Sequence, residues 1–252
     1  RNFAWRLRYS FSSALQARLA TQREAVRFEA QNISWTQQEL NYHSDAVARG
    51  LRALGLQSGD KLMLKLSPGL QSEIITSRLA AARLGAEIVR SKASTSQDFA
   101  TELQDKKPAG VIFDPTLKLG EGTLGDQLSG NSQHSTNVIL EANQVHLGQP
   151  FKCNRNPQLK FLIQTGHYTI PGVYKWRVGT SKSNTEHIEH APNEFSPLES
   201  KELETLAIPE SDQPIVIADA NCNKAFKAGL ANVLKNGRYV IYTDKAQLKS
   251  IL

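Results

Sequence analysis

The chain has 252 residues, of which 40% are hydrophobic and 21% are charged. This composition is typical of a folded globular protein with a sizeable core, and it excludes a disordered or fibrous chain. No apolar run approaches the ~20 residues that cross a bilayer, so no transmembrane segment is expected. Basic residues outnumber acidic ones by 30 to 24, which suits RNA, an anionic membrane surface or a basic compartment.

The first 23 residues form a basic segment. They include serines and several arginines but no acidic residue before Glu24: Arg1, Arg6, Arg8, Arg18 and Arg23. This composition is typical of the mature side of a mitochondrial targeting region, and the first residue is not a methionine. We therefore expect a protein of the mitochondrial matrix or the matrix side of the inner membrane. A basic surface helix is the alternative for residues 1–23.

Helical and extended patterns alternate along the rest of the chain. Thr36 and Glu39 fit a capping box at the start of a helix, and Gly55 can end that helix. The patterns further predict, in chain order, a strand at 61–66, a helix at 71–84, a strand at 86–90, a helix at 96–103, a strand at 110–113, a strand at 214–218, a helix at 224–234 and a strand at 238–242.

Strands that alternate with helices imply right-handed crossovers and a parallel sheet. The predicted fold class is therefore α/β, a mostly parallel sheet with helices on both faces. The polar stretches 116–137 and 179–212 are predicted to be long surface connections.

Three patterns suggest other chemistry only weakly. Gly120–Gly125 spells GxGxxG, but it follows no clear strand, so we predict a flexible loop rather than a dinucleotide site. His187 and His190 have i, i+3 spacing without a third fixed ligand, which predicts a solvated surface and no metal site. Cys153 and Cys222 are far apart in sequence, and we expect two reduced thiols.

Aromatic and basic residues lie close together at several points. Trp5, Trp35 and Trp176 have arginine neighbours and would allow stacking on RNA bases, although core packing is the simpler prediction for Trp35. The basic and aromatic stretch 173–183 could meet RNA, an acidic protein or lipid headgroups.

Residues 34–92 carry a recognisable series of short motifs. Their order is Trp35-Thr36 before Glu39-Leu40, Leu54-Gly55 before Gly59-Asp60, and then Leu84-Gly85-Ala86. This run resembles the N-terminal part of the adenylate-forming superfamily, the acyl-CoA synthetases and their AMP-binding relatives. The stretches 99–115 and 214–242 resemble the elements that follow in that family. The resemblance implies that residues 24–252 form the synthetase-like α/β domain and lack the second subdomain and the C-terminal domain with its catalytic lysine.

Residues 164–173, QTGHYTIPGV, lie where the family carries its phosphate-binding signature, T-S-G-[ST]-T-G-x-P-K-G-V. The second glycine is replaced by Thr169, and the lysine is missing between Pro171 and Gly172. That glycine lets backbone amides approach the pyrophosphate, and that lysine supplies a charge to the phosphates. The resemblance thus implies a vestigial phosphate loop made of Thr165, Gly166, His167, Tyr168, Thr169, Pro171 and Gly172.

A loop without this glycine and lysine is not expected to organise ATP and magnesium for attack. The stretch 218–226 also lacks the aromatic residue and the histidine that active members place there before Phe226. We therefore expect no catalytic residue, no cofactor and no metal, and a pseudoenzyme derived from an acid-CoA ligase.

The sequence then predicts a structural or accessory subunit of a large mitochondrial assembly, with other protein subunits as partners. An ATP synthase or a respiratory complex is the first expectation, and a mitochondrial ribosome the second. Contact with RNA or a membrane surface through basic patches stays open. The alternatives are a regulatory protein that binds acyl-CoA or a nucleotide, and one half of a split acyl-CoA ligase.

Overall fold

The computed structural model describes residues 24–129, 152–166, 170, 173–176, 215–217, 229, 233 and 239–241. They divide into two compact units. The first unit contains residues 24–43 and 68–75 and the described residues after 197, and the second contains 44–67 and the described residues from 76 to 176. Each unit is built around its own sheet.

The sheet of the first unit has the order β10-β11-β1-β2. Its strands are β1 (Glu24–Phe28), β2 (Ile33–Thr36), β10 (Ile215–Ile217) and β11 (Tyr239–Ile241). Strands β10 and β11 lie within the predicted strands 214–218 and 238–242, and they pair in parallel as expected. Strand β1 pairs in parallel with β11 and antiparallel with β2. The sequence patterns gave no indication of β1 and β2.

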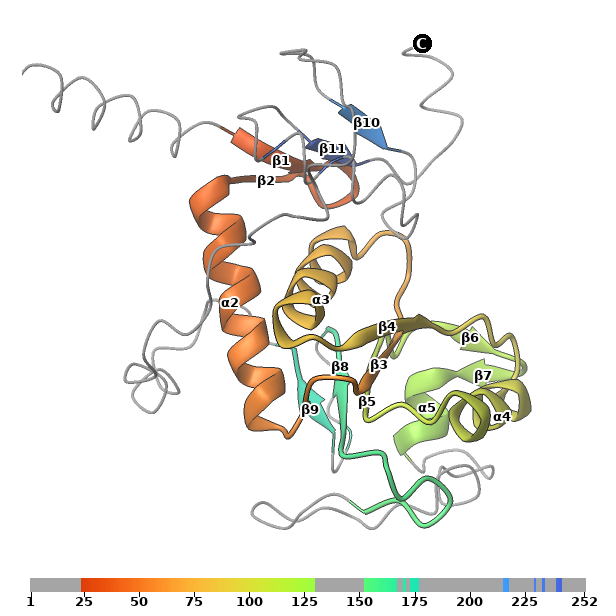
Figure 1. The fold of residues 1–252 in the computed structure, drawn as a ribbon. Coiled ribbons are helices and arrows are strands. Elements are labelled where there is room, and N and C mark those ends of the chain that lie inside the picture. Colours follow the sequence, from red (N-terminus) through yellow and green to blue (C-terminus); the bar gives the residue numbers. More distant parts are fainter. Residues whose placement is uncertain are drawn as a thin grey trace, which may run out of the picture. The chain divides into compact units, whose positions relative to one another are not determined.

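The sheet of the second unit is entirely parallel and has the order β4-β3-β5-β8-β9 (Figure 1). Its strands are β3 (Lys61–Lys65), β4 (Glu87–Arg90), β5 (Gly110–Phe113), β8 (Phe161–Gln164) and β9 (Tyr174–Lys175). The central strands β5 and β8 are buried along their whole length. Continuous apolar runs of this kind suit a parallel sheet that is covered on both faces.

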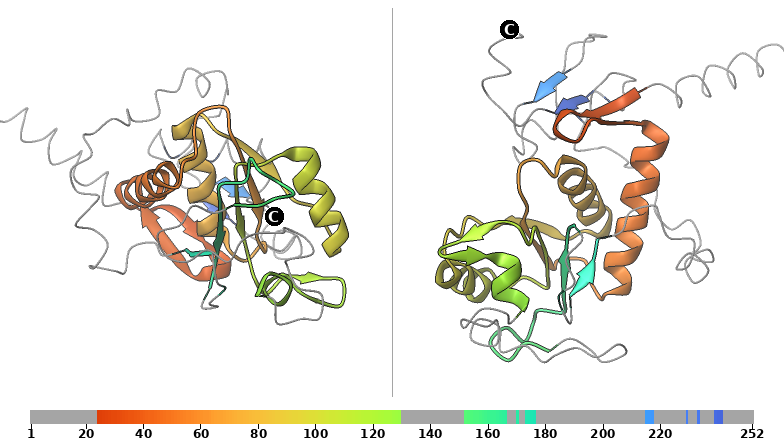
Figure 2. Two further views of the ribbon diagram at one scale, coloured as in Figure 1. Left: turned by 90° about the horizontal axis from the view of Figure 1, so that it is seen from below. Right: turned by 180° about the vertical axis from the view of Figure 1, so that it is seen from behind.

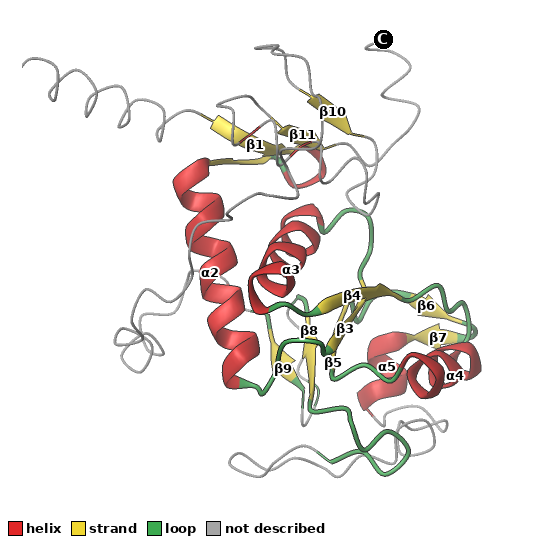
Figure 3. Cartoon of the chain, viewed as in Figure 1, coloured by secondary structure: helices red, strands yellow, loops and turns green. Residues whose placement is uncertain are grey.

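Three long helices follow the predicted positions closely (Figure 3). Helix α2 (Gln37–Ala53) begins with the predicted capping box, in which the Glu39 N–H donates to Thr36 Oγ1 (3.1 Å) and the Thr36 N–H donates to Glu39 Oε2 (2.8 Å). Helix α3 (Gln71–Leu84) has the predicted bounds, and α4 (Ser96–Lys106) runs three residues beyond the predicted 96–103. After α2 and α3 the chain turns at Gly55 and Gly85, whose φ angles are 93° and 69°.

The prediction of a surface connection was wrong for residues 118–129. A short hairpin of β6 (Lys118–Leu119) and β7 (Gly122–Thr123) is followed by α5 (Leu124–Ser129). The flexible loop predicted at Gly120–Gly125 is therefore part of this hairpin and helix. Three leucines among the polar residues of this stretch are buried in the core, and their burial holds it in place: Leu119, Leu124 and Leu128.

Helices α4 and α5 cover one face of the second-unit sheet (Figures 1 and 2). Phe99 and Leu103 of α4 are buried there in one cluster with Met63, Val111 and Phe113 from the strands. On the other face, residues of α2 lie beside Ile163 of β8. The predicted fold class, α/β with a mostly parallel sheet and helices on both faces, is confirmed.

Candidate functional site: the loop after strand β8

The stretch that the resemblance predicts to be a phosphate loop begins at Thr165, where strand β8 ends at the carboxyl edge of the parallel sheet. Ligands of open α/β sheets bind at this edge, so its position suits a binding site. Thr165 continues the ladder, because its N–H donates to the Phe113 carbonyl oxygen at 2.9 Å. The Thr165 hydroxyl donates to the same oxygen at 3.3 Å, and the residue is buried. The hydroxyl of Thr165 is therefore directed into the sheet.

Gly166 supplies the turn that follows. Its φ of 83° is in the left-handed region, which a glycine adopts without steric cost. The chain returns to the sheet at Ile170, which is buried and accepts a hydrogen bond from the Val173 N–H (3.2 Å). The Trp176 N–H donates to the Gln164 carbonyl oxygen at 2.7 Å, beside the parallel pairing of β9 with β8.

The structure therefore places only part of the predicted loop. Thr165 and Gly166 follow β8 directly. The other predicted members lie outside the described residues: His167, Tyr168, Thr169, Pro171 and Gly172. His187, His190, Cys222 and Trp5 also lie outside them.

The remaining single-residue predictions concern packing. Trp35 packs as expected, with its ring 4.8 Å from that of Phe28 and 4.4 Å from that of His43. Cys153 is buried and forms no disulfide with a described residue.

Among the described residues, no group of three or more His, Cys, Asp or Glu side chains could hold a metal ion. No helix in the described part of the chain is long and apolar enough to span a bilayer.

Polar residues also gather at the carboxyl ends of the neighbouring strands. Asp114 follows β5 and is buried, and its Oδ1 accepts hydrogen bonds from the Thr116 N–H (2.9 Å) and hydroxyl (2.6 Å). Lys65 ends β3 and Arg90 ends β4. The carboxyl edge of this sheet thus carries two cations outside the predicted phosphate loop.

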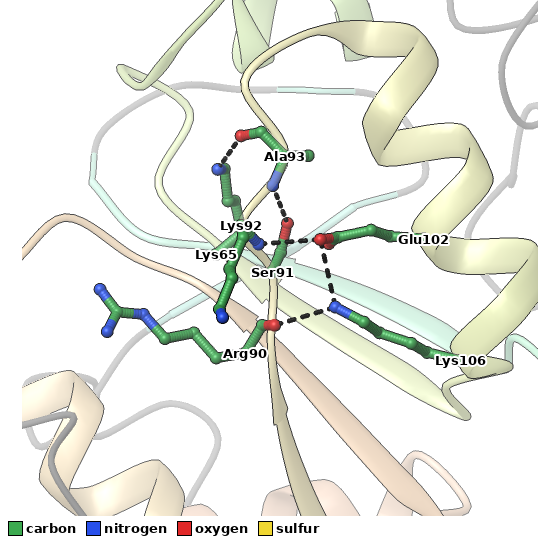
Figure 4. Close-up of polar contacts among 7 residues, drawn as sticks. All are labelled: Lys65, Arg90, Ser91, Lys92, Ala93, Glu102 and Lys106. Atoms are coloured by element: carbon green, nitrogen blue, oxygen red, sulfur yellow. Dashed lines mark hydrogen bonds and ion pairs between the residues drawn. The ribbon is translucent and has the colours of Figure 1, made fainter.

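Lys65 belongs to a cluster that the sequence analysis missed (Figure 4). Its ammonium group donates to the Ala93 carbonyl oxygen. Glu102 of α4 accepts a hydrogen bond from the Lys92 N–H (3.0 Å) and pairs with Lys106 (3.1 Å). The alternation of side chains along β3 puts Lys65 on the same face as the core residue Met63. A lysine on the core face of a strand could therefore have been noticed in the sequence.

A small apolar pocket lies beside strand β9. Its volume is about 260 Å³, and it is an open pocket between the second half of α2 and the edge of the sheet. Its lining residues are Ala46, Val47, Gly50, Leu51, Leu54, Ile163, Tyr174, Lys175 and Trp176. The sequence patterns gave no indication of this pocket, because they gave none of strand β9.

Comparison of the fold with solved structures identifies its class. The chain superposes on coronafacic acid ligase from Pectobacterium brasiliense with a TM-score of 0.57 and 14% identity, over 96% of this chain and 46% of that one. A putative long-chain-fatty-acid CoA ligase from Rhodopseudomonas palustris gives a TM-score of 0.54 and 14% identity, over 91% of this chain and 56% of that one. The chain has the fold of acyl-CoA ligases.

A third match is the inhibitor-bound N-terminal domain of FACL13 from Mycobacterium tuberculosis, with a TM-score of 0.54 and 13% identity. It covers 94% of this chain and 58% of that one. The chain thus spans about half the length of the ligase chains that it matches. No family model matches the sequence, and no curated protein matches it.

Proposed function

We propose that this chain is a ligase-like protein without ATP chemistry, which acts as a structural or accessory subunit of a large mitochondrial assembly. The observation that carries the proposal is the phosphate loop. The stretch 164–173 has no lysine, and Thr169 stands where the signature has a glycine.

Two contacts of the loop support this proposal. The Thr165 hydroxyl is bound to the Phe113 carbonyl oxygen, so it is directed away from a phosphate outside the sheet. Gly166 keeps the turn, but a turn alone offers backbone amides without a cation. Triphosphate binding and in-line attack depend on positioned positive charge, and a loop of this composition supplies none.

The mitochondrial location is proposed from the composition of residues 1–23, which include five arginines and no acid. An ATP synthase or a respiratory complex is the first assembly to examine, and a mitochondrial ribosome is the second. Native gel fractionation of gently solubilised mitochondria, followed by mass spectrometry, tests this part. We expect the protein only in a high-mass fraction, together with the subunits of one complex. A predominantly free monomer would contradict the proposal.

A second candidate function is a regulatory protein that binds acyl-CoA or a nucleotide. The apolar pocket beside β9 favours it, because an apolar cavity of about 260 Å³ can hold part of an acyl chain. Titration of the purified full protein with long-chain acyl-CoA and with ATP, followed by calorimetry, separates the two functions. Saturable micromolar binding favours the regulatory protein. Absence of binding favours the structural subunit.

A further inference from the structure

Lys65 lies at the carboxyl end of β3 and forms no ion pair with another described residue. Its side chain is half-buried, and its amine has one hydrogen-bond partner among the described residues, the carbonyl oxygen of Ala93 (Figure 4). A backbone carbonyl accepts a hydrogen bond but carries no net charge. The ammonium form of Lys65 is therefore solvated less well than that of an exposed lysine.

The carboxylate that raises the pKa of Lys65 is that of Glu102, and its Oε1 also binds two other groups. Glu102 accepts from the Lys92 N–H (3.0 Å) and pairs with the Lys106 ammonium (3.1 Å). Lys106 also donates to the Arg90 carbonyl oxygen at 3.1 Å, which keeps its charge beside the end of β4. Lys65 therefore shares its surroundings with more cations than anions.

The groups that face Lys65 come from three elements. Strand β4 contributes Arg90, and α4 contributes Glu102 and Lys106. Burial lowers the pKa of Lys65, Glu102 raises it by a smaller effect, and Arg90 and Lys106 lower it further. Asp114 follows β5 on the other side of β3, where Thr116 binds its carboxylate. More of Lys65 is thus in the neutral, nucleophilic form at a given pH.

We propose that Lys65 is a modification site, a nucleophilic lysine that takes an acyl group from an activated acyl donor with an anionic leaving group, an acyl phosphate or an acyl thioester. The neutral amine of Lys65 attacks the acyl carbon, and a C–N bond forms. The bond from that carbon to the phosphate oxygen or thiolate sulfur breaks, and the leaving group departs with the bonding electron pair. The amine proton passes to the solvent, and Lys65 becomes a neutral amide.

The surrounding charges favour this reaction in two ways. Arg90 and Lys106 attract an anionic donor, and the loss of a positive charge on acylation relieves their repulsion with Lys65. The amide that forms keeps one N–H, which can still donate to the Ala93 carbonyl oxygen. Acylation of Lys65 is therefore compatible with the fold of the cluster. The proposal does not depend on the function proposed above.

The experiment follows the acylation of individual lysines in the purified full protein. The protein is treated with acetyl phosphate, and in a second arm with acetyl-CoA, and the occupancy of each lysine is measured by mass spectrometry over time. Lys61 is the matched internal control. It lies on the same face of β3 and is also half-buried, but its partner across the ladder is Glu87.

We expect Lys65 to react at least about threefold faster than Lys61 near neutral pH with one or both donors. The donor that gives this difference identifies the class of acyl donor, an acyl phosphate or an acyl thioester. The excess should shrink as the pH approaches the ordinary lysine pKa of about 10.4, because a lowered pKa gives Lys65 less advantage there. It should also vanish in concentrated guanidinium chloride, because the effect depends on the fold. A preference that is equal at every pH would reflect access alone and would overturn the proposal. So would a rate no higher than that of Lys61 with both donors.

Two variants test the cause with opposite signs. Glu102→Gln removes the charge that raises the pKa of Lys65 and should speed its acylation. Lys106→Gln removes a cation that lowers this pKa and leaves Glu102 without its ion pair, so it should slow the acylation. The rates of the two variants are compared under conditions in which circular dichroism shows the same folded fraction as for the parent protein. Changes in the same direction, or no change in either folded variant, would contradict the proposed role of the cluster.

Discussion

Gly110→Ala should destabilise the parallel sheet of the second unit. Gly110 begins β5 and lies opposite Phe161 of β8 in the ladder. A Cβ atom at residue 110 would lie 2.1 Å from Phe161 Cζ and 2.2 Å from its Cε2. Carbon atoms pack at about 3.5 Å or more, so the ring would have to move by more than ~1 Å. Phe161 is fully buried, and protein cores are close-packed, so a shift of its ring is expected to be costly.

The expected cost follows from this clash. Overpacking of a core costs typically about 1–3 kcal/mol, and the lost freedom of glycine returns about 0.4–1 kcal/mol. Because the contact is so short, we expect a cost near the upper end of that range and a net loss of about 2 kcal/mol in the free energy of unfolding. The assay is urea unfolding followed by circular dichroism, with the slope m checked for constancy.

Two further variants make this test specific. Phe161→Leu alone should lower the free energy of unfolding by about 1–2 kcal/mol. Gly110→Ala should cost much less when Phe161→Leu is already present, because the clashing ring is gone. The double variant should therefore be more stable than the sum of the two single losses predicts. Gly50→Ala is the control, since a Cβ there meets nothing within 4 Å and α2 should gain about 0.5–1 kcal/mol. A Gly110→Ala protein as stable as the parent, or strictly additive effects, would refute the reasoning.

Three other changes have expected outcomes. Thr95→Ala removes the capping box of α4 and should lower the free energy of unfolding, measured in urea, by about 1 kcal/mol. Thr101→Ala on the same helix is the control and should leave it unchanged. Equal losses in the two variants would argue against the cap. Leu103→Ala should lower the free energy of unfolding by about 2–5 kcal/mol, because Leu103 is fully buried in the cluster under α4. A loss below about 1 kcal/mol would contradict the burial of Leu103 in this cluster. Burial lowers the pKa of His43 below 6.5, and the opposing effect of Glu39 is smaller, so the unfolded state binds more protons than the folded state. Thermal stability should therefore fall as the pH drops below about 6.5, and His43→Gln should weaken this fall. An unchanged pH profile in the variant would contradict the prediction.

Local signals predicted the helices well. The capping box at Thr36 and the glycines at 55 and 85 mark helix ends through backbone chemistry alone, which a sequence displays directly. Strand β5 was found because it is a short continuous apolar run. The parallel pairing followed from the alternation of strands and helices.

The features that were missed depend on contacts between distant residues. Strand β1 was missed because Glu24 and Arg27 interrupt its apolar residues, and its pairing with β11 joins residues far apart in sequence. The hairpin and α5 were missed because the stretch is polar apart from the leucines, whose burial depends on α4 and β5. The charged groups that act on Lys65 come from β4 and α4, so its surroundings could not be predicted from β3 alone.

The central claim, that this ligase-like chain has no ATP chemistry, is tested most directly by ATP-dependent pyrophosphate release. The purified full protein is incubated with ATP, magnesium and a panel of aliphatic and aromatic carboxylic acids, beside a catalytically active acyl-CoA ligase. We predict that the rate of release stays at the level of the protein-free blank with every acid. Acid-dependent release of pyrophosphate, together with an acyl-adenylate detected by mass spectrometry, would contradict the account.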